Sequence, residues 1–180
     1  MKVLLDACVL YPTVLREILI GAAKAGLFQP LWSDRILEEW ARATVKLGAG
    51  AEVVARGEIA ALRVAFPKGA VLPPPSLQNR LWLPDPNDLH VLAAAIAGGA
   101  DLIVTFNAAD FPRQSLQEEG LNRMDPDQFM MSLCDRAPDQ IATICETVRA
   151  EAARLSGQAI DLRSLMKRAK LPRLGKRLAA

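Results

Sequence analysis

The sequence is poor in the residues on which nucleophilic, redox and disulfide chemistry depend. It has one histidine, His90, and three widely separated cysteines, Cys8, Cys134 and Cys145, which form no C-x-x-C pair. A disulfide framework and a zinc cluster are therefore not expected, and a reducing cytoplasm is favoured. G-x-S-x-G, a glycine-rich phosphate loop and G-x-G-x-x-G are also absent, which argues against triad hydrolases, P-loop enzymes and dinucleotide oxidoreductases.

Long hydrophobic runs are missing as well. No apolar run approaches the length of a membrane span, and Asp6 interrupts the apolar opening MKVLLDACVLYP. We therefore expect no transmembrane helix, no signal peptide and no membrane partner. With 180 residues, 51% of them hydrophobic, the chain can bury a sizeable core as one domain with a small appendage.

Acidic residues are absent from the end of the chain. From Leu162 onwards there are seven basic residues and no acidic one: Arg163, Lys167, Arg168, Lys170, Arg173, Lys176 and Arg177. Removing these seven charges from the net charge of +2 leaves −5 for residues 1–161. Such a tail can attract a polyanion or an acidic partner, and an ordinary solvated helix face has the same pattern.

The pattern of apolar residues predicts strands that alternate with helices. Short apolar runs predict buried strands at residues 3–5, 28–32 and 102–106. Amphipathic or apolar stretches with capping residues predict helices at residues 13–26, 34–47, 51–66 and 86–97. Pro73-Pro74-Pro75 predicts an extended connector. This order predicts an α/β fold with a central parallel sheet flanked by helices.

The character of the chain changes near Asp125. Pro126 and Pro138 can each open a helix, and a basic helix is expected after Ile160. We therefore predict a sheet domain at residues 1–125 and a helical C-terminal extension with a basic tail at residues 126–180.

Five polar residues border the predicted apolar segments: Asp6, Glu39, Asp88, Asn107 and Asp110. The carboxyl ends of parallel strands meet at one edge of a sheet, and the helix that contains Asp88 begins at that edge. Carboxylates crowded there would repel one another unless a cation joined them. Because the ligands are oxygen atoms, Mg²⁺ or Mn²⁺ is the expected ion.

Each of these residues also has a purely structural interpretation. Asp6 can end its strand in a turn, and Asp85 is expected to be a helix cap. Asp88 can complete a capping box with Asp85, and Asn107 and Asp110 can shape the loop that follows their strand. Because these acids are expected to lie together, we favour a role in the metal site for Asp6, Asp88, Asn107 and Asp110.

The glutamate and the histidine are less clear. Glu39 borders the stripe of its helix formed by Ile36 and Trp40, whereas Glu38 points nearly the opposite way. This difference favours Glu39 only modestly, and either residue could be solvated. His90 lies about 200° from Asp88 around its helix, so we expect a structural role and not a catalytic partnership with Asp88.

These motifs together resemble the PIN-domain ribonucleases. VLLDACVLYP is similar to the first-strand motif that contains Asp6, and WSDRILEEWAR is similar to the helix that supplies the glutamate, here Glu39. DPNDLHVLAAAIAGGADLIVTFNAADFP is the most specific match, and it implies that Asp88 is the third acid. The resemblance covers about residues 1–115. It departs at Cys8, where many members have Asn, which puts a supporting hydrogen bond in question.

The resemblance implies an endoribonuclease that uses Mg²⁺ or Mn²⁺ and leaves 5′-phosphate and 3′-hydroxyl ends. Asp6, Glu39, Asp88 and Asp110 would hold the metal, with Asn107 and Thr105 in support. It also implies the toxin of a VapBC-type toxin–antitoxin pair, from a subgroup with a helical C-terminal extension. A homodimer, inhibition by a small antitoxin and a cytoplasmic location follow from that reading. The alternative is a PIN-fold module that binds RNA or protein without catalysis.

The basic tail would then contact RNA through phosphate groups, adding affinity with little reading of sequence. The residues expected to make these contacts are Arg163, Lys167, Arg168, Lys170 and Arg173.

Overall fold

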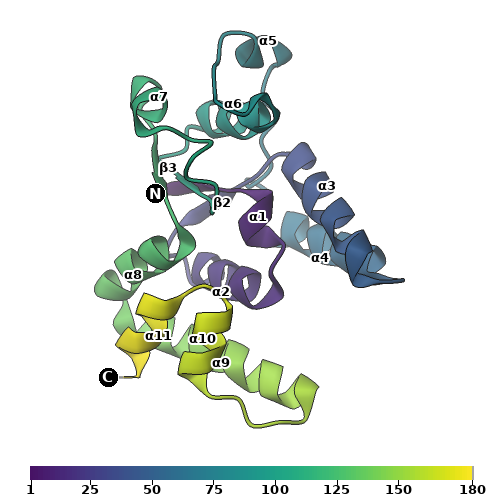
Figure 1. Ribbon diagram of the computed structural model, residues 1–180, viewed down its shortest axis with the longest axis vertical. Coiled ribbons are helices and arrows are strands. Elements are labelled where there is room, and N and C mark those ends of the chain that lie inside the picture. Colours follow the sequence, from purple (N-terminus) through teal and green to yellow (C-terminus); the bar gives the residue numbers. More distant parts are fainter. Residues whose placement is uncertain (180) are drawn as a thin grey trace. The chain divides into compact units, whose positions relative to one another are not determined.

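The computed structural model describes residues 1–179. Its internal contacts divide the chain into two compact units, one formed by residues 1–11 and 28–124 and the other by residues 12–27 and 125–180. The first unit contains the sheet, and the second is helical (Figure 1).

A four-stranded parallel sheet forms the centre of the first unit, with the order β2–β1–β3–β4. The strands are β1 (Lys2–Leu5), β2 (Gln29–Leu31), β3 (Leu102–Val104) and β4 (Asn122–Met124). β1 is an inner strand: its Leu4 pairs with Leu31 on one side and with Ile103 on the other. The predicted α/β fold with a parallel sheet is therefore confirmed.

Eight helical segments accompany the sheet in the first unit. They are α1 (Ala7–Leu10), α3 (Asp34–Ala43), η1 (Thr44–Leu47), α4 (Ala51–Ala65), α5 (Pro75–Gln78), η2 (Pro86–Asp88), α6 (Leu89–Gly98) and α7 (Arg113–Glu118). Ser33 caps α3 by accepting a hydrogen bond from the Ile36 backbone N–H, as its position before an amphipathic stretch predicts.

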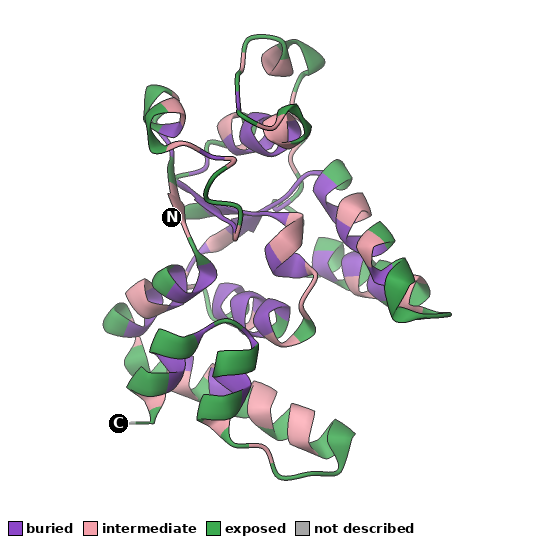
Figure 2. Ribbon diagram, in the orientation of Figure 1, coloured by how far each residue is buried: buried purple, intermediate pink, exposed green. Residues whose placement is uncertain are grey.

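The most apolar of these helices is α6, which packs against β1. Its residues from His90 to Ala95 are all buried, as Figure 2 shows by colour. Gly99 ends the helix in the left-handed conformation that glycine adopts without steric cost. This packing presents the first turn of α6, with Asp88 at its start, close to the end of the strand that precedes Asp6.

Several local predictions differ from the structure. The helix expected at 34–47 becomes a 3₁₀ turn from Thr44, and the helix expected at 86–97 begins as the 3₁₀ segment η2. The extended connector expected at Pro73–Pro75 ends in α5, since Pro75 occupies a first helical turn that needs no N–H. α1, α7 and β4 were not predicted, because segments of only four, six and three residues are too short to show a repeating pattern.

The second unit contains α2 (Thr13–Lys24), α8 (Pro126–Arg136), α9 (Pro138–Ser156), α10 (Leu162–Arg168) and α11 (Pro172–Leu178). α2 comes from the N-terminal part of the sequence and packs against α9. A Cβ atom on Gly21 would lie 2.7 Å from Cγ2 of Ile144, so the absent side chain permits the close approach of these two helices. The predicted division at residue 125 thus separates two helices that pack together.

The basic helix expected after Ile160 is two helices, α10 and α11. Lys170 between them has a positive φ of 60°, and Pro172 opens α11. The helices approach closely because Gly175 has no side chain, where a Cβ atom would lie 2.8 Å from Cβ of Met166. None of the helices in residues 1–179 combines the length and the apolar character that a membrane span requires.

Candidate functional site

Asp6 lies directly after β1 and is buried. Its backbone N–H donates to the Val104 carbonyl (3.2 Å), which continues the pairing of β1 with β3. Its Oδ2 atom accepts hydrogen bonds from Oγ1 of Thr105 (2.7 Å) and Sγ of Cys8 (3.2 Å). A carboxylate at the end of an inner strand is thus held by two donors from separate segments.

Thr105 and Cys8 also connect Asp6 to the loop after β3. Thr105 is buried, and its hydroxyl accepts the Asn107 backbone N–H (3.0 Å). Cys8 Sγ accepts the Phe106 backbone N–H (3.3 Å). Burial and then the charge of Asp6 raise the pKa of the Cys8 thiol to about 12. The thiol therefore stays protonated and donates a hydrogen bond to Asp6. Cys8 therefore makes the supporting hydrogen bond that its replacement of asparagine had put in question.

Asp88 lies at the end of η2, at the N-cap position of α6. The Asp85 side chain caps η2 by accepting the Asn87 backbone N–H (2.9 Å), as predicted, whereas the Asp88 side chain makes no cap hydrogen bond. Burial, followed by the charges of Asp6, Asp110, Asp85 and Glu39, raises the pKa of Asp88 to about 6. The neighbouring acids are therefore close enough to disfavour the ionisation of Asp88.

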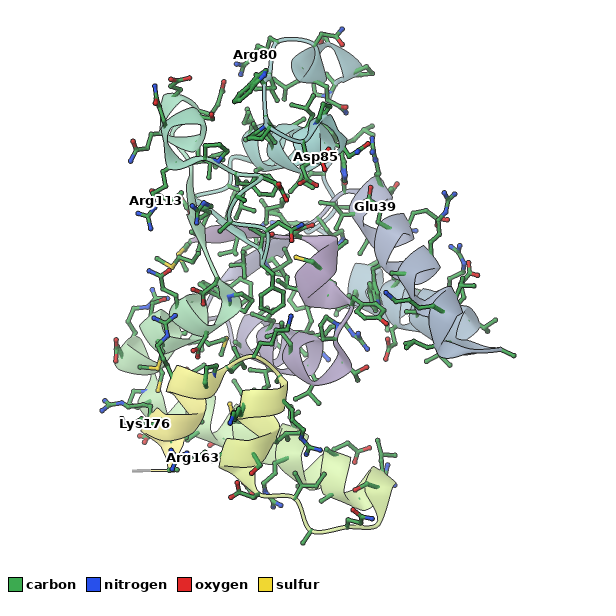
Figure 3. All side chains as sticks on the ribbon, in the orientation of Figure 1. Glu39, Arg80, Asp85, Arg113, Arg163 and Lys176 are labelled. Atoms are coloured by element: carbon green, nitrogen blue, oxygen red, sulfur yellow. The ribbon has the colours of Figure 1, made fainter. Side chains whose placement is uncertain are left out.

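Glu39 lies on α3 (Figure 3), and its surroundings differ from those of Glu38 on the same helix. Oε1 of Glu39 accepts a hydrogen bond from Nε of Arg35 (3.1 Å) and lies 3.0 Å from Nε2 of His90. Burial raises the pKa of Glu39, Arg35 opposes this effect, and Asp6 adds to it. Glu38 instead binds Arg56 and Arg42, which lower its pKa to about 2.

His90 is buried at 3% exposure, and its partner is on another helix. Burial and then the charge of Arg35 lower the pKa of His90 to about 4, so the ring is neutral near pH 7. Because Nε2 faces a carboxylate oxygen, Nε2 carries the proton and donates it to Glu39. Within residues 1–179 the buried Nδ1 atom has no hydrogen-bond partner. This contact was not predicted, because helical periodicity relates His90 only to residues of its own helix, such as Asp88.

Asn107 and Asp110 lie in the turn that follows β3 and Thr105. The Asp110 backbone N–H donates to the Asn107 carbonyl (3.2 Å), the Asn107 side chain is exposed, and Asp110 is half-buried. Asp110 contributes to the raised pKa of Asp88, which places its charge among the other acids. The structure thus brings Asp6, Glu39, Asp88 and Asp110 into one electrostatic neighbourhood.

The donor set of this neighbourhood fits a hard divalent cation, because its side chains offer carboxylate, amide and hydroxyl oxygen atoms. Among residues 1–179, however, no three His, Cys, Asp or Glu side chains form a group that could hold a metal ion as they stand. Asp6 is engaged by Thr105 and Cys8, and Glu39 by Arg35 and His90. In each carboxylate these partners hold one oxygen, Oδ2 of Asp6 and Oε1 of Glu39, and the other oxygen is left for a ligand.

The basic residues of the tail belong to the second unit. Arg163, Lys167, Arg168 and Lys170 are exposed. Arg173 differs, since its guanidinium contacts Asp127 (3.1 Å) and Asp125 (3.3 Å).

Comparison with known proteins identifies the family. A family model described as PIN domain matches residues 2–109. The chain belongs to the PIN-domain family. The matched segment of this PIN domain contains Asp6, Glu39, Asp88 and Asn107, and Asp110 follows it by one residue. The fold is of the nuclease type, and members of the family generally use divalent metal ions. No curated protein and no solved structure matches the chain.

Proposed function

We propose that this PIN-domain protein is an endoribonuclease that depends on Mg²⁺ or Mn²⁺ and leaves 5′-phosphate and 3′-hydroxyl ends. The observation that supports it best is the electrostatic coupling of carboxylates from separate elements, expressed in the raised pKa of Asp88, where burial and then Asp6 and Asp110 act. Folding brings together like charges that a divalent cation would stabilise. A purely structural set of caps and turns would not need this arrangement.

In this proposal Asp6, Glu39, Asp88 and Asp110 hold the metal, and Asn107 adds an amide oxygen. A bound divalent ion supplies Lewis acidity and activates water for attack on a phosphodiester. The other residues position these ligands. Thr105 and Cys8 orient Asp6 from two sides, and His90 and Arg35 orient Glu39.

We further propose that the protein is the toxin of a VapBC-type pair. It would act in the cytoplasm as a homodimer and be inhibited by a small antitoxin. The support for this role is the compact PIN domain followed by a helical extension.

The α10–α11 pair would contact RNA phosphates. Within residues 1–179 no acidic side chain forms an ion pair with Arg163, Lys167 or Arg168, although the charge of Arg163 helps to lower the pKa of Asp161. Arg149 and Arg154 on α9, by contrast, each form an ion pair with a glutamate. Arg173 is engaged by Asp127, so we expect it to contribute less to RNA binding than its neighbours.

An RNA cleavage assay with Mg²⁺, Mn²⁺ or EDTA tests the nuclease proposal. Asp6→Asn and Glu39→Gln should abolish cleavage, and EDTA should abolish the activity of the wild-type protein. Glu38→Gln is the matched control, because this neighbouring glutamate on the same helix faces Arg56 and Arg42 and should retain activity.

Equal loss in the two glutamate variants would contradict the assignment of Glu39. Absence of cleavage on total RNA, together with absence of Mn²⁺ binding by calorimetry, would replace the nuclease with the alternative, a PIN-fold module that binds RNA or protein without catalysis.

A further inference from the structure

The segment between α4 and η2 is anchored at two points close to each other in sequence. Arg80 forms a two-pronged ion pair with Glu119, in which Nη2 lies 2.8 Å from Oε2. Leu83 is buried in the core of the first unit. Backbone that is tied on both sides in this way presents the intervening residues in a defined position.

Trp82 lies between these anchors, and 69% of its side chain is exposed. The other two tryptophans, Trp32 and Trp40, are completely buried. No other aromatic side chain in residues 1–179 is exposed. The protein therefore presents one large aromatic surface to solvent, on a support that holds it there.

The anchored segment leads directly into the acidic neighbourhood. Trp82 precedes Asp85 by three residues, so their Cα atoms lie within about 11 Å of each other. At the other anchor, Glu119 follows α7, the helix that begins just after Asp110. Figure 3 labels Arg80 and Asp85, which mark the beginning and the end of this stretch.

The surroundings of Trp82 fit a nucleobase better than an apolar protein surface. Within residues 79–85 the other exposed side chains are Asn79, Arg80 and Pro84, whereas Leu81 is half-buried and the exposed Leu72 lies ten residues away in sequence. An indole face stacks on any unpaired base, and such stacking platforms are characteristic of proteins that bind single-stranded nucleic acid.

We propose that Trp82 is a stacking platform for an unpaired base of the RNA substrate, held in place by the Arg80–Glu119 ion pair and by Leu83, on the segment that leads to Asp85 and Asp88. This inference rests on the proposed action on RNA, and it adds that the strand must be single-stranded where it enters the site.

Intrinsic fluorescence tests the proposal directly, because only Trp82 among the three tryptophans is exposed. The full chain with Asp6→Asn is titrated with an unstructured adenylate decamer, and acrylamide quenching is measured before and after. The RNA should change the emission and protect it from acrylamide. A decamer with an abasic backbone should do neither, because it offers phosphates without bases.

Affinity for a labelled decamer gives a second readout. Trp82→Ala in the same background should weaken binding about tenfold, within the range of one base–aromatic stack. Trp82→Phe should retain most of the affinity, because phenylalanine also stacks. Leu72→Ala is the matched control: Leu72 is 90% exposed in the same segment, so its removal should leave RNA affinity unchanged.

Each outcome decides the inference. RNA binding with unchanged Trp82 emission and equal affinity of Trp82→Ala would overturn it, while cleavage by the wild-type protein would leave the nuclease standing. Base-dependent protection of Trp82 without cleavage would support it and overturn the nuclease. Absence of binding to the decamer would overturn the inference, and the cleavage assay would then decide the nuclease separately. Loss of binding to a protein partner alone in Trp82→Ala would assign the residue to a protein interface.

Discussion

Nε2 of His90 lies 3.0 Å from Oε1 of Glu39, and this contact joins the apolar helix α6 to the amphipathic helix α3. Nε of Arg35 donates to the same oxygen atom. One oxygen of the Glu39 carboxylate is therefore held by two donors, and the other is left for a ligand. A neutral histidine in this place fixes the orientation of a glutamate without adding charge.

We expect His90→Leu to lower Mn²⁺ affinity and cleavage about tenfold or more, since partners that orient a ligand typically contribute that much. His90→Gln should retain most of both, because its amide can donate to Glu39. Calorimetry with Mn²⁺ and the cleavage assay check this result. Equal losses in the two variants, with unchanged thermal unfolding, would show that the donated hydrogen bond has no role.

Asp88→Asn should stabilise the unliganded protein at pH 7 while it abolishes cleavage. Burial and then neighbouring acids raise the pKa of Asp88 from 3.8 to about 6. Between these two pH values the folded chain holds a proton that the unfolded chain has released. The stability of the wild-type protein due to Asp88 is therefore present below about pH 4 and falls as pH rises to about 6. The asparagine side chain does not titrate, so the Asp88→Asn variant does not lose this stability as the pH rises.

His90 complicates the wild-type pH profile, because its pKa is lowered to about 4 by burial and Arg35. Its contribution falls in the opposite direction, as pH drops from about 6.5 towards 4. The measurement is therefore the difference in melting temperature between Asp88→Asn and the wild type, which should grow from pH 4 to pH 7. Asp135→Asn, at an exposed aspartate of α8, is the control. A difference that is constant with pH would contradict the prediction.

Cys8 should resist alkylation in the folded protein. Burial and the charge of Asp6 raise the pKa of its thiol to about 12, and the thiolate is the reactive form. Iodoacetamide at pH 8 should modify Cys8 on the order of 1,000-fold more slowly than an unperturbed thiol. Peptide mapping by mass spectrometry before and after unfolding in urea checks this rate. Rapid labelling of the native protein would show that Cys8 is not held against Asp6.

Asp127→Ala should destabilise the second unit by about 2 kcal/mol, since it removes a buried acceptor at a helix start. Asp127 accepts the backbone N–H groups of Arg173 (2.9 Å) and Leu174 (3.0 Å) at the first turn of α11. Urea unfolding measures the lost free energy of unfolding, and Asp135→Ala provides the control, because Asp135 lies with Asp127 on α8. A loss no larger than that of the control would contradict the role of Asp127 as the cap of α11.

The sequence was sufficient where apolar runs and polar residues alternate sharply. β1 followed by Asp6 was readable because a buried strand must end where charge begins, and the strand predicted at 102–106 contains β3, which ends two residues earlier at Val104. The edge strand β4 was not, since Asn122–Met124 pairs on one side only and lacks an apolar run. The break between α10 and α11 had a signal in Pro172, whose preceding residue is disfavoured in helices.

The contacts that orient the acids could not be predicted, because they join residues distant in sequence. His90 meets Glu39 across two helices, and Thr105 meets Asp6 across two strands. Helical periodicity assigns faces within one element and says nothing about which element lies opposite. Likewise, the exposed Trp82 becomes noticeable only once Leu83 and Arg80 are seen to be anchored.

The inner position of β1 has a consequence for the newly made protein. β1 is synthesised first, yet one of its two neighbours, β3, begins at Leu102, and Asp110 comes later still. A nascent chain that has emerged only to Ala100 lacks half of the support for Asp6 and one of the four acids. The proposed metal site therefore cannot be complete on the ribosome until β3 and Asp110 have been translated.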